Sequence, residues 1–365
     1  MVATARSSLL TWTTIAPLLS VVVLVVTWGR VPGAFLVALV AVVLAATVLA
    51  AVHHAEVVAL RVGEPFGSLV LAVAVTVIEV ALIVTLMASG GPETASLARD
   101  TVFAAVMITT NGIVGISLLL GALRYGVTLF NPEGSGAALA TVATLATLSL
   151  VLPTFTTSQP GPEFSPAQLT FAALASLALY GLFVFAQTVR HRDFFISVTA
   201  DGVVESEEHA PTPSGRETWA SLALLLVALV AVVGLAKVES PAIEAGVRAA
   251  GFPQSFVGVV IALLVLLPET IAAARAALRE RVQTSLNLGY GSAMASIGLT
   301  IPTIALATIW LDGPLVLGLG ATQTVLLVLT IVVSVLTVVP GRATRLQGGV
   351  HLVLLAAFLF LAINP

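Results

Sequence analysis

Residues 66–88 read FGSLVLAVAVTVIEVALIVTLMA, a continuous apolar run of 23 residues whose single ionisable side chain is Glu79. A helix needs about 20 mostly apolar residues to cross the hydrocarbon core of a bilayer. A strand of a membrane barrel needs only about 10 residues and alternates polar with apolar side chains. The run is too long and too continuous for such a strand. It therefore predicts a membrane-spanning helix with a carboxyl group near its middle.

The composition of the whole chain agrees with a membrane environment. Of its 365 residues, 58% are hydrophobic and 9% are charged, whereas about 25% of residues are charged in soluble globular proteins. So few charges cannot cover the surface of a soluble protein, which excludes soluble enzymes and disordered chains. The net charge of −3 provides no basic field for nucleic acid. The absence of cysteine excludes disulfides, thiolate metal ligands and a cysteine nucleophile.

The same length criterion predicts an all-α membrane protein with eleven transmembrane helices. The predicted spans are 9–28, 35–58, 66–88, 101–123, 136–152, 166–189, 218–236, 254–274, 285–310, 314–339 and 348–363. The first run is too long for a signal peptide and has no small-residue cleavage site, so we interpret it as a helix.

Basic residues predict the orientation, because cytoplasmic loops of membrane proteins are enriched in lysine and arginine. With the N-terminus in the cytoplasm, 11 of the 15 lysine and arginine residues face the cytoplasm. This cytoplasmic set is Arg6, Arg61, Arg124, Arg190, Arg192, Arg216, Arg275, Arg279, Arg281, Arg342 and Arg345. The outer set is Arg30, Arg99, Lys237 and Arg248. An odd number of spans then places the C-terminus outside.

One loop, residues 190–217, carries six acidic residues and the helix-breaking stretch PTPSG. It is either a solvated linker between two halves or a segment that attracts cations or regulates the protein. In both interpretations it divides the chain. We predict an extra N-terminal helix in 1–34, a first five-helix repeat in 35–189, the acidic cytoplasmic loop in 190–217 and a second five-helix repeat in 218–365.

Two glutamates are the candidate functional residues. By the predicted spans, only Glu79 and Glu269 of the 18 acidic residues lie deep inside a helix. An ionisable group at the bilayer centre costs about 2.5–3.5 kcal/mol even on insertion scales, and such residues mark ion paths by default. The alternative is a protonated glutamate that is hydrogen-bonded between two helices.

The two glutamates occupy equivalent positions in the predicted halves. Glu79 lies 13 residues after Phe66, and Glu269 lies 13 residues after Phe256, which is about 20 Å along a helix. The loop before the first of these helices is predicted to be cytoplasmic, and the loop before the second to be outside. The two helices therefore run in opposite directions. An inverted repeat with an acid at the same depth in each copy is typical of secondary transporters.

Small and polar residues accompany each acidic helix. Neutral oxygens are ligands that hard cations accept, and small residues let helices approach closely. The stretch TTNG at 109–112 contains Thr110 and Asn111, and the stretch GYGSAMAS at 289–296 contains Ser292 and Ser296. These residues either support the site or serve close packing.

Pro268 precedes Glu269 directly. A proline inside a helix leaves the carbonyl four residues earlier, here that of Leu264, without its donor and kinks the helix. The freed carbonyl is a further candidate cation ligand, and a kink needed only for packing is the alternative. His53, His54 and Glu56 form a cluster at the predicted cytoplasmic end of the second span. It is either an interfacial anchor or a pH-sensitive group.

Several of these stretches resemble a known family. Residues 54–67 (HAEVVALRVGEPFG) with Ile78-Glu79-Val80, residues 267–270 (LPET) and residues 285–293 (SLNLGYGSA) resemble bacterial calcium/proton, and sodium or potassium/proton, antiporters. These form the cation/proton exchanger branch of the calcium/cation antiporter superfamily. The likeness covers nearly the whole chain. It implies efflux of Ca²⁺, and of Na⁺ or K⁺, driven by proton entry across the prokaryotic cytoplasmic membrane, with the two repeat glutamates as metal ligands.

Charge neutrality predicts how such an exchange is coupled. Two carboxylates beside one Ca²⁺ are neutral, and so are two protonated carboxyls, whereas two bare carboxylates are costly in hydrocarbon. Access should therefore change only when the site holds metal or protons. The expected partners are small inorganic cations, protons and the lipid bilayer, with no cofactor and no nucleic acid. The oligomeric state stays open.

Other functions remain as alternatives at this point. A monovalent Na⁺ or K⁺/H⁺ antiporter on the same scaffold is the first, and cation competition would separate it from a calcium exchanger. An intramembrane enzyme would need a nucleophile or metal constellation that the sequence does not contain. A cation channel would need a filter-like loop.

The orientation can be tested by labelling. A cysteine at Ser206 should react with a membrane-impermeant reagent only from the cytoplasmic side, and a cysteine at Ser158 only from outside. The native chain has no cysteine, so the background is clean. Labelling from the opposite sides would contradict the orientation inferred from the basic residues.

Overall fold

The computed structural model describes residues 11–30, 33–63, 66–90, 94–197, 212–310 and 313–365. Arg6 and most of the predicted acidic loop, including Ser206, lie outside these residues. The described helices are α1 (Trp12–Thr27), α2 (Ala34–Val62), α3 (Phe66–Gly90), α4 (Leu97–Met107), η2 (Ile108–Ile113), α5 (Val114–Tyr125), α6 (Pro132–Ala146), η3 (Thr147–Val151), α7 (Leu152–Phe155), α8 (Pro166–Phe185), η4 (Ala186–Arg190), η5 (Arg192–Phe195), α9 (Gly215–Ala249), α10 (Phe256–Ala277), α11 (Val282–Ala307), α12 (Ala321–Val338) and α13 (Arg345–Ile363). Two short strands, β1 (Thr128–Leu129) and β2 (Arg342–Ala343), pair antiparallel.

The all-α membrane architecture is confirmed. The described part of the chain contains 10 helices that are long and apolar enough to cross a membrane, together with the shorter apolar helix α1. Three of these spans are built from consecutive helical segments, among them α4–η2–α5, which forms one span over Leu97–Tyr125. The first predicted span, residues 9–28, corresponds to α1. Its 16 described residues make it shorter than the usual membrane-crossing helix.

One predicted boundary was wrong at the start of the tenth span. We expected a helix from residue 314, but α12 begins at Ala321. The backbone N–H groups of Gly318 and Leu319 donate to the carbonyls of Pro162 and Leu150, so they are not available to a helix. Gly318 also lies so close to Thr154 and Pro162 that a Cβ atom would clash. Tertiary contacts therefore override the apolar pattern here.

A second predicted boundary was wrong at the end of the seventh span. We expected a helix over 218–236, but α9 continues to Ala249 and is 35 residues long. Lysine and glutamate are good helix formers, so Lys237 and Glu239 do not end the helix. Pro241 lies inside it and removes one N–H donor without terminating the helix.

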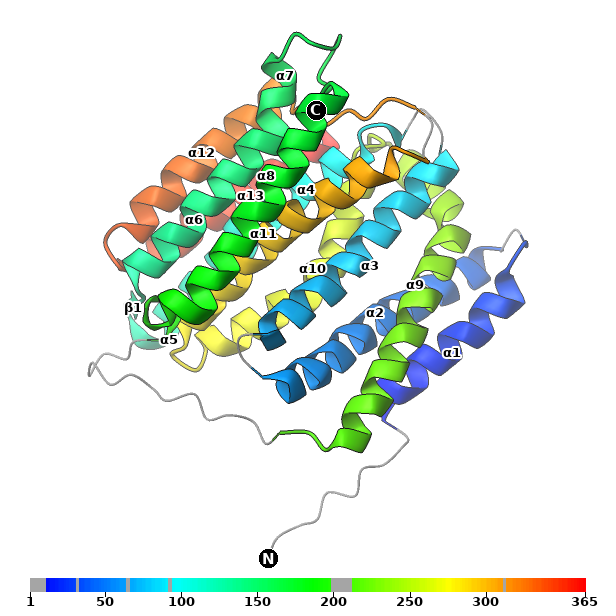
Figure 1. Cartoon of the computed structure of the whole chain (residues 1–365), viewed down its shortest axis with the longest axis horizontal. Coiled ribbons are helices and arrows are strands. Elements are labelled where there is room, and N and C mark those ends of the chain that lie inside the picture. The colour runs from blue at the N-terminus through cyan, green and yellow to red at the C-terminus, as the bar shows by residue number, and fades with distance from the viewer. Residues whose placement is uncertain (1–10, 31–32, 64–65, 91–93, 198–211, 311–312) are drawn as a thin grey trace, which may run out of the picture. The chain divides into compact units, whose positions relative to one another are not determined.

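The chain divides into two compact units, which are described separately. Unit 1 comprises Met1–Ile78 and Ala210–Ala242, and therefore α1, α2, the first half of α3 and most of α9. Within it α1 packs against α2, and Gly234 of α9 approaches Leu24 of α1 so closely that a Cβ atom would meet Leu24 Cδ2 at 2.5 Å. Figure 1 shows α1, α2 and α9 side by side.

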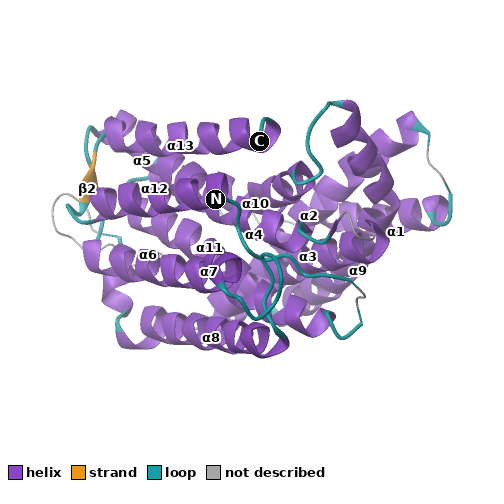
Figure 2. Ribbon diagram, turned by 90° about the horizontal axis from the view of Figure 1, so that it is seen from above, coloured by secondary structure: helices purple, strands orange, loops and turns teal. Residues whose placement is uncertain are grey.

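Unit 2 comprises Glu79–His209 and Ile243–Pro365. Its centre is formed by α4–η2–α5, α10 and α11, which pack against one another. Around this centre α13 packs on α12, α12 on α6 and α6 on α8, and these four helices follow one another across the unit in Figure 2. The division into two five-helix repeats remains a prediction, because the compact units describe packing and not repeat symmetry.

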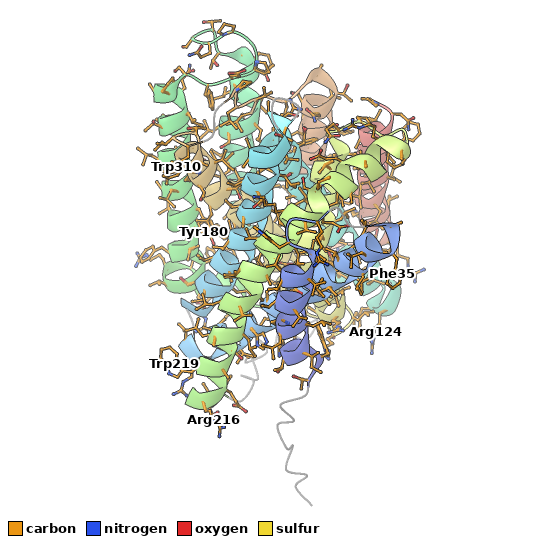
Figure 3. The ribbon with its side chains drawn as sticks, turned by 90° about the vertical axis from the view of Figure 1, so that its right-hand side faces the viewer. Phe35, Arg124, Tyr180, Arg216, Trp219 and Trp310 are labelled. Carbon is orange, nitrogen blue, oxygen red and sulfur yellow. The ribbon has the colours of Figure 1, made fainter. Side chains whose placement is uncertain are left out.

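Large apolar side chains cover the outside of the helices. Phe35 is 84% exposed, Trp219 73% and Trp310 74%, and all three are labelled in Figure 3. Trp219 lies on the first turn of α9 beside Arg216, and Trp310 follows the end of α11. Tryptophan next to arginine at a helix end is typical of the membrane–water interface. An exposed apolar surface of this kind is expected of a protein that spans a membrane.

Glycines let α13 pack closely against α5. A Cβ atom at Gly348 would lie 2.6 Å from the Leu119 backbone nitrogen, and one at Gly115 would lie 3.0 Å from His351 Cβ. Without a side chain at these two positions the helices approach closely, as is usual for small residues at membrane helix interfaces. This contact fixes the height of α13 relative to η2.

Gly348→Ala should destabilise the protein, because the added methyl group meets backbone and not a flexible side chain. Overpacking of this kind costs about 1–3 kcal/mol of the free energy of unfolding. The neighbouring variant Gly349→Ala is the control, since a Cβ atom there meets nothing within 4 Å. Thermal unfolding in detergent measures both variants, and equal melting temperatures would contradict the close contact.

Candidate cation- and proton-binding site

Glu79 lies within α3 and is 4% exposed. Its Oε1 atom accepts a hydrogen bond of 2.5 Å from the Ser296 hydroxyl of α11. Ser296 is itself buried, with 2% exposure. The structure therefore joins two of the residues that the sequence singled out, 217 positions apart, into one buried pair. A hydroxyl donor stabilises a carboxylate, and a charge-assisted bond of this kind is stronger than a neutral one.

Ser292 lies four residues before Ser296 on α11 and is half-buried. Residues four apart share one face of a helix, so Ser292 lies on the same face as Ser296, one turn earlier. This position is compatible with its predicted supporting role, which remains a prediction.

Glu269 lies on α10 and is 9% exposed. The helix continues through Pro268 from Phe256 to Ala277. Because Pro268 has no N–H group, the carbonyl of the half-buried Leu264 lacks its usual helical donor. The roles of Glu269 and of the Leu264 carbonyl as ligands remain predictions.

Glu269 and Asn111 lie at about the same level on neighbouring helices. Gly258, near the start of α10, contacts the backbone of Asp100 and Thr101 near the start of α4. The helix α10 then packs in turn along α4, η2 and α5. Glu269 is 11 residues beyond Gly258, and Asn111 is 11 residues beyond Asp100. The level of Glu269 is therefore the level of η2.

Asn111 lies in η2, a π-helical segment in the middle of its span. Such segments are rare and often occur at functional sites. Its side chain is fully buried and has partners on two other helices. The Oδ1 atom lies 3.2 Å from His351 Nδ1 of α13, and the Nδ2 atom donates to Thr330 of α12 at 3.0 Å. The sequence does not single out His351, because the apolar stretch around it gives no sign of a polar partner on another helix.

Thr110, the neighbour of Asn111, directs its hydroxyl to its own helix. The Thr110 Oγ1 atom donates to the Val106 carbonyl at 2.5 Å, and it lies 3.5 Å from Asn111 Nδ2. Asn111 and Thr110 therefore form a buried neutral polar cluster with α12 and α13. This cluster lies in the element that packs against both α10 and α11, the helices of Glu269 and Ser296.

The expectation that only Glu79 and Glu269 lie deep inside a helix was wrong for Glu239. It lies within α9, which extends past the predicted end, and it is 3% exposed. Its Oε2 atom has no hydrogen-bond partner in the described part of the chain. Asp100, also buried at 4% exposure, is instead compensated by an ion pair of 2.8 Å with Arg99 and a hydrogen bond of 2.8 Å from Ser96.

The predicted cluster around His53 is split by the structure. His53 is exposed, whereas His54 is 3% exposed. The Nε2 atom of His54 donates to the Thr13 carbonyl at 3.0 Å, and its Nδ1 atom lies 3.2 Å from the Ser221 hydroxyl. His54 therefore connects α1, α2 and α9 within unit 1.

A bundle of membrane-spanning helices around a buried carboxyl defines a helical membrane transporter. The chain belongs to the sodium/calcium exchanger family, since the family model described as "Sodium/calcium exchanger protein" matches residues 30–189 and 220–364. This membership confirms the resemblance found in the sequence and the predicted class of secondary cation exchanger.

Individual relatives span nearly the whole chain. The chain is 46% identical over 361 residues to the "Putative ionic transporter y4hA" of Sinorhizobium fredii, covering 97% of this chain and 96% of that protein. It is 35% identical over 349 residues to the "Sodium-potassium/proton antiporter ChaA" of Escherichia coli, covering 94% of each chain. It is 23% identical over 325 residues to a "Ca(2+)/H(+) antiporter" of Aphanothece halophytica, covering 85% of this chain and 86% of that protein.

The fold is similar to that of a solved exchanger. The crystal structure of the H⁺/Ca²⁺ exchanger CAX superposes with a TM-score of 0.72 at 15% identity, covering 95% of this chain and 86% of that chain. At this identity the likeness concerns the fold alone.

Ser296→Ala should weaken cation binding, because Glu79 loses the donor that stabilises its carboxylate. A hydrogen bond to a charged group contributes about 1.5–3 kcal/mol, so we expect the half-saturating cation concentration to rise about tenfold or more. Ser117→Ala is the matched control, since the buried Ser117 hydroxyl has no hydrogen-bond partner in the described residues. Unchanged cation affinity in Ser296→Ala would remove Ser296 from the site.

Proposed function

We propose that this protein is a secondary active antiporter that exports Ca²⁺, and Na⁺ or K⁺ as further cargo, in exchange for protons. Glu79 and Glu269 are the groups that bind cation and proton in turn. The family membership supports exchange, and the printed functions of two relatives, sodium-potassium/proton and calcium/proton antiport, support protons as the counter-ion.

The observation that carries this proposal is the buried Glu79 carboxyl with its Ser296 donor. An ionised carboxylate removed from water costs several kcal/mol unless it is compensated. One hydroxyl compensates it only in part, so a bound cation or a proton is required for the rest. Two ligands that satisfy the same buried group compete for it, and this competition is the basis of exchange.

Neutrality then couples the two ions. Ca²⁺ with two carboxylates carries no net charge, and neither do two protonated carboxyls. The transporter changes access in these two states and not with bare carboxylates, whose transfer through hydrocarbon is unfavourable. Glu79 and Glu269 alternate between the two loaded states, and access changes by movement of one part of the protein around them.

A monovalent exchanger is the second candidate. The 35% identity to the Escherichia coli sodium-potassium/proton antiporter over almost the whole chain favours it. Na⁺ or K⁺ would bind with one glutamate ionised and the other protonated, which is again neutral, and the exchange would be one for one. Competition between Ca²⁺ and each monovalent cation separates the two candidates.

We propose the cytoplasmic membrane of a prokaryote as the location, with the N-terminus in the cytoplasm and the C-terminus outside. The bias of arginine and lysine toward one set of loops supports this orientation. The protein acts as a transporter and not as an enzyme, and the ions are substrates, so no cofactor is needed.

Glu79→Gln and Glu269→Gln should each reduce exchange to the background of empty liposomes while the protein remains folded. Glutamine keeps the shape of the side chain but cannot release a proton. Glu239→Gln is the matched control, because Glu239 is also a buried glutamate of a spanning helix but lies outside the pair. Normal exchange by either pair variant would contradict the assignment of that residue.

Exchange of one Ca²⁺ for two H⁺ should be electroneutral. In proteoliposomes with a fixed pH gradient, the reversal point of calcium flux is expected to stay constant as the membrane potential is clamped at different values. Calcium flux that does not depend on the proton gradient would instead indicate a channel. A reversal point that moves with potential would require a further proton carrier beyond the two glutamates.

A further inference from the structure

A cavity in unit 1 lies outside the exchange site and is lined by positive charge. It has a volume of about 500 Å³ and lies where the turn after α1 and the start of α2 face α9. Arg30 and Lys237 contribute the two charged side chains, and none of its described lining residues is acidic. Pockets of about 300–1,000 Å³ are of the size that binds small ligands or headgroups.

The two cations come from distant parts of the sequence. Arg30 follows α1, and Lys237 lies on α9, so the fold brings them to one place. They are two of only four basic residues that the orientation assigns to the outer side. Since outer loops of membrane proteins are poor in basic residues, the meeting of two of the four in one cavity is a specific feature of this fold.

Trp28 holds one of these charges in place. The Lys237 Nζ atom lies over the Trp28 ring, 5.5 Å from its centroid. Such a cation–π contact is favourable and leaves the ammonium N–H donors available to a ligand. Trp28 is 55% exposed and directly follows the apolar helix α1, and tryptophan at the end of an apolar helix is typical of the headgroup level of a membrane.

The rest of the lining is apolar. Val37, Val238 and Ala242 line the cavity, and residues 237, 238, 241 and 242 share one face of α9. Glu239 does not belong to this face, because it is buried while Lys237 is exposed. The cavity therefore presents two cations and an apolar wall on one surface, without a neighbouring carboxylate in its lining.

From this arrangement we propose that the cavity binds the headgroup of an anionic phospholipid. The phosphate and its negative charge lie against Arg30 and Lys237, and the glycerol backbone and upper acyl carbons lie against Trp28 and the apolar residues of α2 and α9. A zwitterionic headgroup fits less well, because its ammonium group meets two like charges. Basic pockets between membrane helices bind anionic headgroups on the cytoplasmic side of membranes, and the same contact between a phosphate and two cations is available here to an anionic lipid of the outer leaflet.

The test uses the full-length protein in a neutral detergent, with phosphatidylglycerol and phosphatidylcholine as probes. Native mass spectrometry measures bound lipid, and thermal unfolding measures stabilisation, which rises with occupancy. Phosphatidylglycerol should bind and stabilise, and phosphatidylcholine should do so much less. Arg30→Gln and Lys237→Gln should each weaken binding about fivefold, and both replace side chains that are exposed.

Arg124→Gln is the matched control, because Arg124 is also an arginine beside an aromatic ring, that of Tyr125, at 5.6 Å. It lies in unit 2 and is predicted to face the cytoplasm. Trp28→Leu should weaken binding although both cations remain. Three results would each overturn the proposal. They are an equal loss of lipid binding in Arg124→Gln, equal binding of the two lipids, and unchanged lipid binding in Arg30→Gln and Lys237→Gln. Complete displacement of phosphatidylglycerol by soluble glycerol phosphate at equal concentration would assign the cavity to free phosphate and overturn its assignment to a lipid.

Discussion

The cost of an uncompensated charge in hydrocarbon is the constraint on which the function of this protein depends. The Glu79 carboxyl is buried away from water, and in the described part of the chain it accepts a short hydrogen bond from Ser296. This donor is sufficient to orient the carboxyl but does not replace full hydration. In the proposed cycle, a cation or a proton provides the compensation that the Glu79 carboxylate still lacks. A better compensated carboxylate, such as Asp100 with Arg99 and Ser96, has no such requirement and is suited to a structural role.

Neutral polar groups, held by close helix contacts, support this arrangement. Asn111 forms hydrogen bonds to α12 and α13 from within the π-helical segment η2. Irregular backbone at membrane depth is tolerated where protein surrounds it, and Asn111 is fully buried. The glycine contact of Gly115 with His351 brings the two helices together. Because η2 packs on both α10 and α11, a rigid η2 gives the helices of Glu269 and Ser296 a common support.

The sequence predicts the spans well because a bilayer imposes a simple length and polarity requirement on each helix. It also identifies Glu79 and Ser296 separately, Glu79 as an ionisable residue at membrane depth and Ser296 as part of a stretch of small and polar residues. It does not predict that they meet, because the hydrogen bond joins helices far apart in the chain. The start of α12 and the extension of α9 through Glu239 were missed for a related reason. Their boundaries depend on tertiary hydrogen bonds and on helix propensity, and not on hydropathy.

The buried histidines connect helices in both units. His54 donates to the Thr13 carbonyl and faces the Ser221 hydroxyl. Because a carbonyl only accepts and a hydroxyl can donate, these two partners satisfy a neutral imidazole, with one nitrogen as donor and the other as acceptor. His351 faces Asn111 Oδ1 and the Thr337 hydroxyl, and that hydroxyl donates its proton to the Val333 carbonyl of its own helix. His54 therefore links α2 to α1 and α9, and His351 links α13 to η2 and α12, whereas the proposed cycle places its protonation changes on the two glutamates.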